Sequence, residues 1–444
     1  MRKHTIAFLK KKILRSYAIT ITKCTKRSRY YERIMRMSKT LISVDVTKKA
    51  HEQPIPLHNR WHPDIPAVAQ VEAGDTFRVE CIDWTGGQIK NDDSALDVLK
   101  IDLTQVHYMS GPIAVAGAEP GDLLVVDILD IGPLRDSEWG FTGIFAKENG
   151  GGFLTDYFPK AQKAIWDIQG IYTQSRHIPH VRFEGITHPG LMGVAPSQEL
   201  LEQWNKREAA LVATDPQRVP PLANLPEPHG ALVGKLRGAD ADRVAREGAR
   251  TVPPRENGGN CDIKNLTRGS RIYFPVFVKE ALLSMGDIHF SQGDGEISFC
   301  GAIEMAGWIN IKVDIIKKGA QEYGVTSPFV KTGNMEPRFD EYLLFEGISV
   351  DEKGKQEYLN ATTAYRRACL QAIEYLKKFG YSGEQAYVLL STAPCEGRIS
   401  GIVDIPNACS TIAIPTAIFD FDIKPTSAGP KIQKIEKNLA QAQK

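Results

Sequence analysis

The segment Gly286–Glu304 (GDIHFSQGDGEISFCGAIE) concentrates side chains that could carry out chemistry. Asp287 and His289 are two residues apart, so in a strand both would project from the same face. The tight Gly-Asp-Gly turn that follows can bring Asp294 and Glu296 back toward that face. The spacing therefore predicts a cluster of one imidazole and several carboxyl groups.

Two kinds of chemistry fit such a cluster. In one, Asp287, His289 and Glu296 hold a divalent metal, with zinc favoured, and a bound water ionises near neutral pH. In the other, a carboxylate acts as base and His289 carries the proton without a metal. In the metal-assisted alternative, Glu296 is expected to be the base that later protonates the leaving group. A purely structural alternative is that Asp294 caps a turn and His289 is a buried, hydrogen-bonded histidine. No nucleotide-binding motif occurs, and no organic cofactor is expected.

A second polar segment, Glu256–Asp262 (ENGGNCD), is dense in glycine. Gly258 and Gly259 would let backbone amides approach a ligand closely, as an oxyanion site requires. Asn260 and Asp262 could orient an amide NH2 group, and Asp262 is also a candidate catalytic carboxylate. A plain loop turn would explain the same residues.

Two further segments contain candidate residues. Val106–Pro112 (VHYMSGP) places His107 and Ser110 before a Gly-Pro turn. His107 is a candidate substrate ligand, whereas Ser110 would need a base in reach to act as a nucleophile. Cys395 lies beside Glu396, which would suit a thiol nucleophile with a carboxylate base. Because the chain has seven cysteines, one beside an acid is unremarkable, and this alternative is secondary.

Short apolar runs separated by Gly and Pro predict that strands dominate the fold. Thr76–Asp83 alternates apolar and polar residues, and Leu123–Ile131 is a continuous apolar run after a turn. The best helix is expected over 357–378, where Gly380 suits the position after its end. The expected fold class is α+β, mainly β, with β-sandwich or barrel-like layers, a helical insertion and a C-terminal helix.

The same patterns divide the chain into parts. The expected parts are a basic extension outside the fold (1–36), a β-rich N-terminal part (37–196), a helical and Pro-rich insertion (197–256), a β-rich catalytic part (257–424) and a loose tail (425–444). An interdomain linker is an alternative interpretation of residues 197–256.

Charge is distributed unevenly along the chain. Residues 1–36 hold twelve Lys/Arg and a single acid, whereas the remainder carries a net charge of −9. A mildly acidic body gives no electrostatic footprint for nucleic acid, so no nucleic-acid partner is expected. The basic leader has the composition of a targeting peptide or a nucleic-acid-binding arm. Met37 is nevertheless the preferred start, because the strand-like run Leu41–Val46 begins just after it.

Hydropathy and cysteine usage indicate the compartment. No apolar run reaches the ~18 residues of a membrane span, so no membrane contact is expected. Seven cysteines, an odd number without a C-x-x-C pair, indicate reduced thiols. A cytoplasmic protein acting on a small molecule is therefore expected.

Nine segments, in order from about residue 40 to 420, resemble the acetamidase/formamidase family, and specifically its longer formamidase branch. They are PLHNRWHPDI, DWTGGQIKNDDSALDV, VHYMSGPI, AEPGDLLVVDI, ENGGGFLTDYFP, THPGLMGVAPS, ENGGNCDIKNL, SMGDIHFSQGDGEISFCGAIE and APCEGRISGIVDIPNA. Nine ordered segments are far more specific than any single motif. The leader lies outside the resemblance, which agrees with Met37 as the start.

The resemblance implies hydrolysis of formamide to formate and ammonia by a cytoplasmic homo-oligomer, a trimer or a multiple of one. It also implies that Glu304 binds substrate and that the catalytic residues are Asp262, His289, Asp294 and Glu296. Shorter relatives tend to have His where this chain has Asn257, which weakens the metal interpretation. Two alternatives stay open: a larger amide such as acetamide or indole-3-acetamide as the substrate, and a non-enzymatic amide-binding protein.

Overall fold

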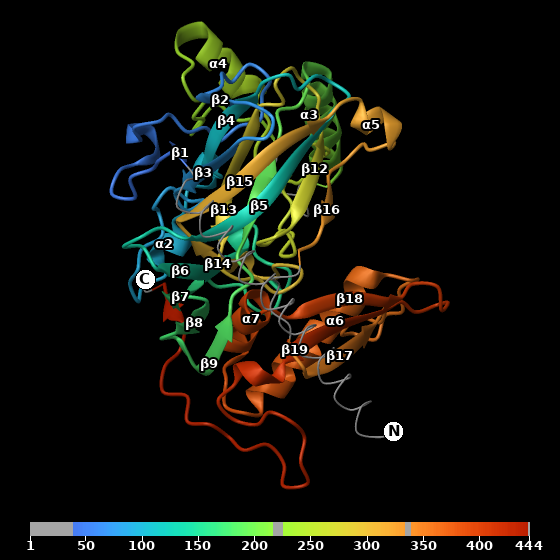
Figure 1. Ribbon diagram of the computed structural model, residues 1–444. Coiled ribbons are helices and arrows are strands. Elements are labelled where there is room, and N and C mark those ends of the chain that lie inside the picture. The colour runs from blue at the N-terminus through green and yellow to red at the C-terminus, as the bar shows by residue number, and fades with distance from the viewer. Residues whose placement is uncertain (1–38, 216–224, 334–338, 443–444) are drawn as a thin grey trace, which may run out of the picture.

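The computed structural model describes residues 39–215, 225–333 and 339–442, so the expectation for residues 1–36 lies outside the described residues. Within these ranges the strands form three sheets (Figure 1). The six-stranded sheet has the order β1 (Lys39–Ile42), β3 (Thr76–Cys81), β15 (Gly307–Ile316), β5 (Leu123–Pro133), β12 (Arg271–Pro275) and β16 (Phe329–Lys331).

The eleven-stranded sheet carries the chemistry-bearing segments. Its main path is β11 (Gly258–Asn260), β10 (His188–Gly193), β13 (Leu283–His289), β14 (Phe299–Met305), β6 (Trp139–Ile144), β7 (Gln162–Gln169), β8 (Tyr172–Ser175) and β9 (Ile178–Glu184). Off this path, β4 (Met109–Val115) pairs with β13 and with β2 (Ala69–Val71), and β20 (Ala440–Gln441) pairs with β7.

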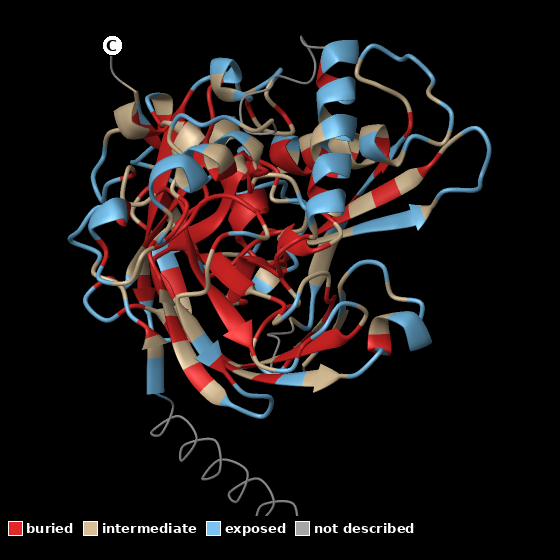
Figure 2. Cartoon of the chain, turned by 90° about the horizontal axis from the view of Figure 1, so that it is seen from above, coloured by how far each residue is buried: buried red, intermediate tan, exposed pale blue. Residues whose placement is uncertain are grey.

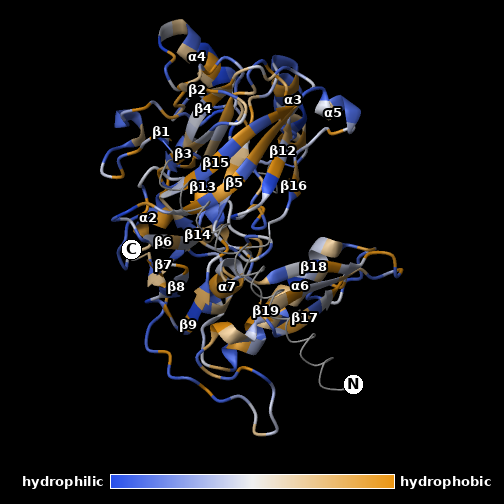
Figure 3. Cartoon of the chain, in the orientation of Figure 1, coloured by the Kyte–Doolittle hydropathy of each residue, from blue (hydrophilic) through white to orange (hydrophobic). Residues whose placement is uncertain are grey.

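The two large sheets share one hydrophobic core. Val79 and Ile311 of the six-stranded sheet and Met285 and Ile288 of the eleven-stranded sheet belong to the same buried cluster. Figure 2 shows the buried residues filling the centre of the molecule, and Figure 3 shows the apolar and polar segments of the strands. Burying these side chains gives about 25 cal/mol per Å² of apolar surface, which is the main driving force for the layers. The predicted α+β, mainly β class is confirmed.

Strands from both predicted β-rich parts, 37–196 and 257–424, interleave in both large sheets. β15 lies between β3 and β5, and it pairs with β5 along ten residues. The active-site segments therefore sit in a sheet that needs both parts of the chain.

A third, three-stranded sheet lies in the C-terminal part, with the order β17 (Tyr342–Ile348), β19 (Cys409–Pro415) and β18 (Glu396–Gly401). One face is covered by α6 (Ala361–Lys377), which begins after Asn360 because the Asn360 side chain accepts the Thr363 N–H. This capping bond explains why the helix starts inside the predicted range 357–378. α7 (Gly383–Thr392) is buried and packs against α6 on one side and against β14 and β6 on the other.

The predicted insertion, 197–256, contains two helices: α3 (Gln198–Thr214), capped by Ser197, and α4 (Gly238–Glu247). Short helices α2 (Leu96–Leu99) and α5 (Gly319–Glu322) lie in loops of the β body. At the other end of the chain, residues 425–439 carry no helix or strand, but β20 is hydrogen-bonded to β7. Among the described residues, none of the helices has the length and apolar character needed to cross a membrane.

Candidate active site

β13 and β14 place an imidazole opposite a carboxyl group. His289 and Glu304 are direct partners in the antiparallel register, so their side chains meet on one face. His289 Nε2 lies 2.9 Å from Glu304 Oε2 and 3.2 Å from Asp287 Oδ1. Asp287 is two residues before His289 and lies on the same side of the strand, as the period of a strand predicts. All three side chains are buried.

Two further acids come from loops. Asp262 follows β11, and its N–H donates to the Gly190 carbonyl at 3.1 Å. Glu296 closes a tight turn by donating its N–H to the Gly293 carbonyl at 3.1 Å. The carboxyl group of each lies within 4.8 Å of a ring nitrogen of His289. Asp262, Asp287 and Glu296 have φ angles of 50°, 53° and 45°, a backbone conformation that residues other than glycine adopt at a cost.

Burial raises the pKa of three of these acids. The pKa of Asp262 is raised to about 7 and that of Glu304 to about 8. Burial and the charge of Asp262 raise the pKa of Glu296 well above its ordinary value. These effects favour the protonated form of Glu296, while Asp262 titrates near neutral pH.

Asp287 and His289 shift the other way, as an ion pair. Burial alone would raise the pKa of Asp287, but the charge of the neighbouring His289 lowers this pKa to about 2. Burial alone would lower the pKa of His289, but the charges of Glu304 and Asp287 raise it well above its ordinary value. In the absence of a bound metal ion, His289 is therefore the positively charged group of the cluster.

Three buried atoms of the cluster, His289 Nε2, Glu304 Oε2 and Asp262 Oδ1, have no hydrogen bond of acceptable geometry. Buried polar atoms are normally satisfied, so a ligand that accepts their lone pairs would complete the site. Two trios of side chains have candidate ligand atoms within 4.8 Å of one another: Asp262, Asp287 and His289, and His289, Glu296 and Glu304. One imidazole with carboxylates suits zinc, so the residues present fit a divalent metal. The predicted ligands Asp287, His289 and Glu296 are divided between the two trios.

The opposite edge of the His289 ring is fixed by hydrogen bonds. His188 on β10 is the register partner of His289. His188 Nδ1 lies 2.6 Å from the Ile186 carbonyl oxygen, which can only accept, so this nitrogen carries a proton. Burial lowers the pKa of His188 to about 3, and its Nε2 lies 3.0 Å from Gln292 Oε1. His289 Nδ1 also lies 3.0 Å from Gln292 Oε1, which can only accept, so His289 Nδ1 is a donor and His289 Nε2 faces the acids.

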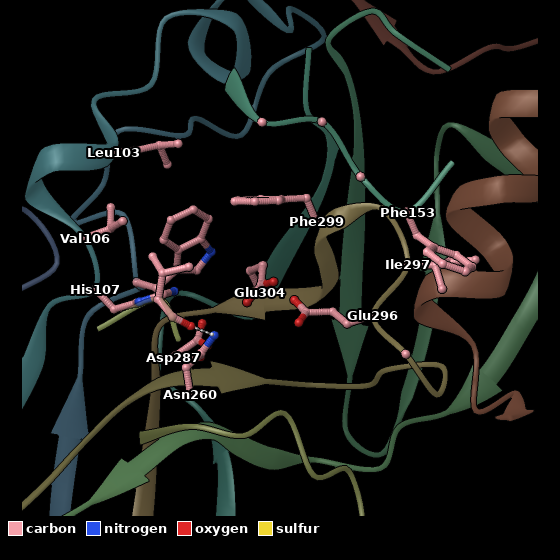
Figure 4. A pocket seen from close by; sticks show the side chains of 16 residues that line it. Leu103, Val106, His107, Phe153, Asn260, Asp287, Glu296, Ile297, Phe299 and Glu304 are labelled. Carbon is pink, nitrogen blue, oxygen red and sulfur yellow. Dashed lines mark hydrogen bonds between the residues drawn. The ribbon is translucent and has the colours of Figure 1, made fainter. Parts of the chain in front are cut away.

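A pocket of about 440 Å³ opens onto the cluster (Figure 4). Asp287, Glu296 and Glu304 line it together with Asn260 and His107. Figure 4 shows the carboxyl groups of Glu296 and Glu304 pointing into the pocket, with the ring of Phe299 beside them. The apolar lining consists of Trp84, Leu103, Val106, Phe153, Val252, Ile297 and Phe299. The pocket thus has an acidic floor and apolar walls.

His107 and Asn260 have polar atoms free to bind a ligand. His107 Nδ1 lies 3.0 Å from Thr251 Oγ1, and burial lowers the pKa of His107, so the ring is held neutral. Asn260 donates through Nδ2 to the Val252 carbonyl at 3.2 Å, whereas its buried Oδ1 has no hydrogen bond. An amide NH2 group in the pocket would satisfy Asn260 Oδ1.

The family model that matches residues 43–421 is that of the acetamidase/formamidase family. The chain belongs to this family. It is 66% identical over 394 residues to a formamidase from Methylophilus methylotrophus, covering 89% of this chain and 97% of the relative. It is 60% identical over 370 residues to an acetamidase from Mycolicibacterium smegmatis, covering 81% and 91%. A solved structure of a gamma lactamase from Delftia acidovorans is 60% identical, with a TM-score of 0.89 over 91% of this chain and 100% of that chain.

Within this acetamidase/formamidase chain, two predicted site residues lie elsewhere. Asp294 does not line the pocket: its carboxylate binds Lys264 Nζ at 3.1 Å and the Gly397 N–H at 2.7 Å. The turn carries Asp294 outward and Glu296 inward, which corrects the catalytic assignment of Asp294. Gly259 was expected to donate a backbone amide to the substrate, but it is paired with Met192 in the β10–β11 ladder and is not part of the pocket lining.

The two alternative nucleophiles, Cys395 and Ser110, make contacts that fit structural roles. Cys395 is fully buried, and burial raises its pKa to about 12, so a thiolate is disfavoured. Ser110 Oγ donates to the Glu80 carbonyl at 2.6 Å. Asn257, where shorter relatives tend to have His, donates to the Val194 carbonyl at 2.8 Å and supports the neighbouring backbone.

Sequence reasoning missed His188, Gln292, Thr251 and Gly190. A Cβ on Gly190 would lie 2.4 Å from His289 Cε1 and 2.7 Å from Asp287 Oδ2, so only glycine fits there. The motif THPG, which contains both His188 and Gly190, was a signal that could have pointed to them. Thr251 carries no such signal.

Proposed function

We propose that this chain is a formamidase, which hydrolyses formamide to formate and ammonia in the pocket above His289. The observation that carries the proposal is the group of acids Asp287, Glu296 and Glu304 on the pocket floor, with Asp262 and His289 within 4.8 Å of Asp287. Its groups hold and move protons at neutral pH, which is what water attack on an amide requires. The 66% identity to a formamidase supports formamide as the substrate.

The residues divide the reaction into proton steps. Asp262, with its pKa raised to about 7, takes a proton from the attacking water. Glu296, whose protonated form is favoured by burial and by the charge of Asp262, gives its proton to the amide nitrogen as the C–N bond breaks. The proton taken up by Asp262 then returns to Glu296, which restores both groups. The products are ammonia and formic acid, which ionises to formate. In the absence of a bound ion, protonated His289 offers positive charge where the oxygen of the carbonyl becomes negative.

Substrate binding must come from hydrogen bonds, because formamide offers little apolar surface. Asn260 Oδ1 would accept an N–H of the amide, and this atom has no hydrogen bond in the folded chain. His107, neutral and held by Thr251, would bind through its other ring nitrogen. Glu304 lines the same floor and completes the polar set.

A divalent metal, with zinc favoured, is part of the proposal. His289 would hold it with acids drawn from Asp262, Asp287, Glu296 and Glu304. When bound, such an ion supplies a water that ionises near neutral pH and polarises the carbonyl. Binding the ion would require the acids with raised pKa values to release their protons, so metal affinity would increase with pH.

A cytoplasmic homo-oligomer, a trimer or a multiple of one, is proposed on weaker support. Cys81, Cys300, Cys369 and Cys395 are buried free thiols, which is typical of a reducing compartment. The outer face of the three-stranded sheet exposes Leu344, which is 64% accessible and suits contact with another subunit.

A second candidate substrate is a larger amide. The apolar walls and the 440 Å³ volume exceed what a one-carbon amide fills. The named relatives include an acetamidase and a gamma lactamase, both 60% identical to this chain. An acyl group of a few carbons would contact Phe299 and Trp84.

The test is ammonia release by the purified full chain from formamide, acetamide and indole-3-acetamide. We expect the highest kcat/KM for formamide. A higher kcat/KM for either larger amide would replace formamide as the substrate. Release from none of the three would overturn the amidase proposal and favour an amide-binding protein.

A further inference from the structure

The loop that carries Glu296 is attached to the C-terminal part of the chain through backbone hydrogen bonds. The Gly293 N–H donates to the Ser391 carbonyl at 2.8 Å, and the Asp294 N–H donates to the Cys395 carbonyl at 3.1 Å. The Tyr365 hydroxyl donates to the Asp294 carbonyl at 2.6 Å. A Cβ on Gly293 would lie 2.0 Å from the Leu390 carbonyl oxygen, so the loop approaches α7 as closely as the backbone allows.

Lys264 joins this loop to the segment that carries Asp262. The Lys264 ammonium group is buried, with 5% of its side chain exposed, and lies 3.1 Å from Asp294 Oδ1. It also donates to the Cys395 carbonyl at 2.7 Å. The second oxygen of Asp294 accepts the Gly397 N–H at 2.7 Å. The Lys264 ammonium group therefore contacts both the loop that carries Glu296 and the backbone directly before β18.

The positions of Lys264 and Asp294 in the sequence connect this ion pair to the two acids of the site. Lys264 is two residues after Asp262, and Asp294 is two residues before Glu296. The carboxyl groups of Asp262 and Glu296 each lie within 4.8 Å of a ring nitrogen of His289, yet they come from separate loops with strained backbones. A fixed distance between the two loops is needed to keep both acids beside His289.

We propose that Lys264 is a positioning residue for hydrolysis, because its ion pair with Asp294 fixes the loops that carry Asp262 and Glu296. The inference rests on the proposed function of these two acids. A misplacement of about 1 Å at a catalytic group can lower a rate about 100-fold, so loss of the Lys264–Asp294 ion pair should lower kcat. This ion pair does not contact the substrate, so KM is expected to change little.

The experiment compares Lys264→Met with Lys163→Met in the full chain. Lys163 is a matched control because it is fully buried, donates to the Lys90 carbonyl at 2.8 Å and pairs with Asp97 Oδ2 at 2.7 Å, away from the pocket lining. We expect Lys264→Met to lower kcat about 10- to 100-fold with KM within about twofold. Lys163→Met should lower the Tm while kcat per folded molecule stays near the wild-type value.

Two further variants keep the test decisive. Lys264→Arg retains the cation and should recover part of kcat. Asp294→Asn retains an oxygen for the Gly397 N–H, so it should fold even where Lys264→Met does not, and it should lower kcat by a similar factor. Normal kcat in both Lys264→Met and Asp294→Asn overturns the inference, as does normal kcat in Asp294→Asn alone if Lys264→Met fails to fold.

Amide hydrogen exchange separates this inference from the proposed function. We expect peptides that contain residues 293–297 to exchange faster in Lys264→Met than in the wild type or in Lys163→Met. An unchanged exchange rate of these peptides in Lys264→Met overturns the positioning role of Lys264. Faster exchange in a chain whose wild type releases no ammonia from any amide would overturn only the proposed function.

Discussion

Gln292 Oε1 lies 3.0 Å from His289 Nδ1 on the side of the ring that faces away from the acids. Gln292 itself is fixed, because its Nε2 donates to the Asp262 carbonyl at 2.8 Å. Gln292 therefore links the imidazole to the loop of a neighbouring acid. It keeps a proton on His289 Nδ1, so Nε2 is the nitrogen directed at the pocket floor, and Nε2 is free to bind an ion once it has lost its own proton.

Gln292→Leu should therefore lower kcat about 10- to 100-fold, the usual cost of losing a hydrogen bond that orients such a histidine. The measurement is the steady-state rate with formamide together with the Tm. Gln385→Leu is the matched control, because Gln385 is fully buried and donates to the His177 and Lys437 carbonyls. It should lose stability and keep its turnover. Equal kcat in the two variants would remove Gln292 from the site.

His289→Ala should lower kcat by about 10²–10⁴, because the group that balances the acids and carries charge is lost. Removing a buried partner also costs about 1–3 kcal/mol of stability, so the Tm must be measured beside kcat. Cys395→Ala is the control: its buried thiol, with a raised pKa, should be dispensable for turnover. A destabilised His289→Ala variant with normal turnover per folded molecule would move the site elsewhere. Loss of turnover in Cys395→Ala would favour a thiol nucleophile.

Metal removal should inactivate the protein if the trios around His289 bind an ion. We expect about one ion per chain by elemental analysis, loss of activity and a lower Tm after chelation, and recovery on adding zinc. His289→Ala should abolish the binding measured with zinc alone. Full activity with less than about a tenth of an ion per chain would contradict the metal proposal.

Acid should weaken the attachment of α3 to the segment before β11. Arg207, and to a smaller degree Trp204, hydrogen-bond Glu256 and lower its pKa to about 2. A lowered pKa means that the unfolded chain binds more protons, so this stabilisation is complete above the unfolded pKa and is lost as the pH falls toward 2. Glu256→Gln should cost on the order of 1 kcal/mol at pH 7, and this difference should shrink between pH 5 and pH 2.

Urea unfolding of the wild type and of Glu256→Gln at pH 7, 5 and 3 measures this difference. Glu341→Gln is the control, because Glu341 pairs with Lys424 at the surface, where such a pair is worth little, and it should change stability less than Glu256→Gln at pH 7. A Glu256→Gln difference that does not depend on pH would mean that the charge of Glu256 is not what holds α3.

Part of the site was readable from the sequence because strand periodicity is local. The spacing of two residues put Asp287 and His289 on one face, and the turn chemistry of Gly293–Glu296 returned Glu296 to it. The same turn sends Asp294 the opposite way, where its carboxylate pairs with Lys264 and accepts the Gly397 N–H. Local pattern gives the cluster but does not distinguish which acid in a turn faces inward.

The rest depends on register between distant strands. His188 meets His289 because β10 and β13 pair, and no local signal sets that register. Gly259 looked like a free amide donor, yet its backbone pairs with Met192. The mainly β class followed from composition and periodicity, whereas the order of strands from two parts of the chain did not. Which distant strands pair, and in which register, is thus what the local patterns of a single sequence do not predict.

Asp262, Asp287 and Glu296 all sit in left-handed backbone conformations, at three separate points of the chain. A residue other than glycine costs of order 1 kcal/mol at each such point. A sequence selected only for thermostability would place glycine at all three positions, and would lose the acids in doing so. This chain therefore gives up some robustness to heat at the places where its chemistry lies, and thermostabilising substitutions should be sought away from these three residues.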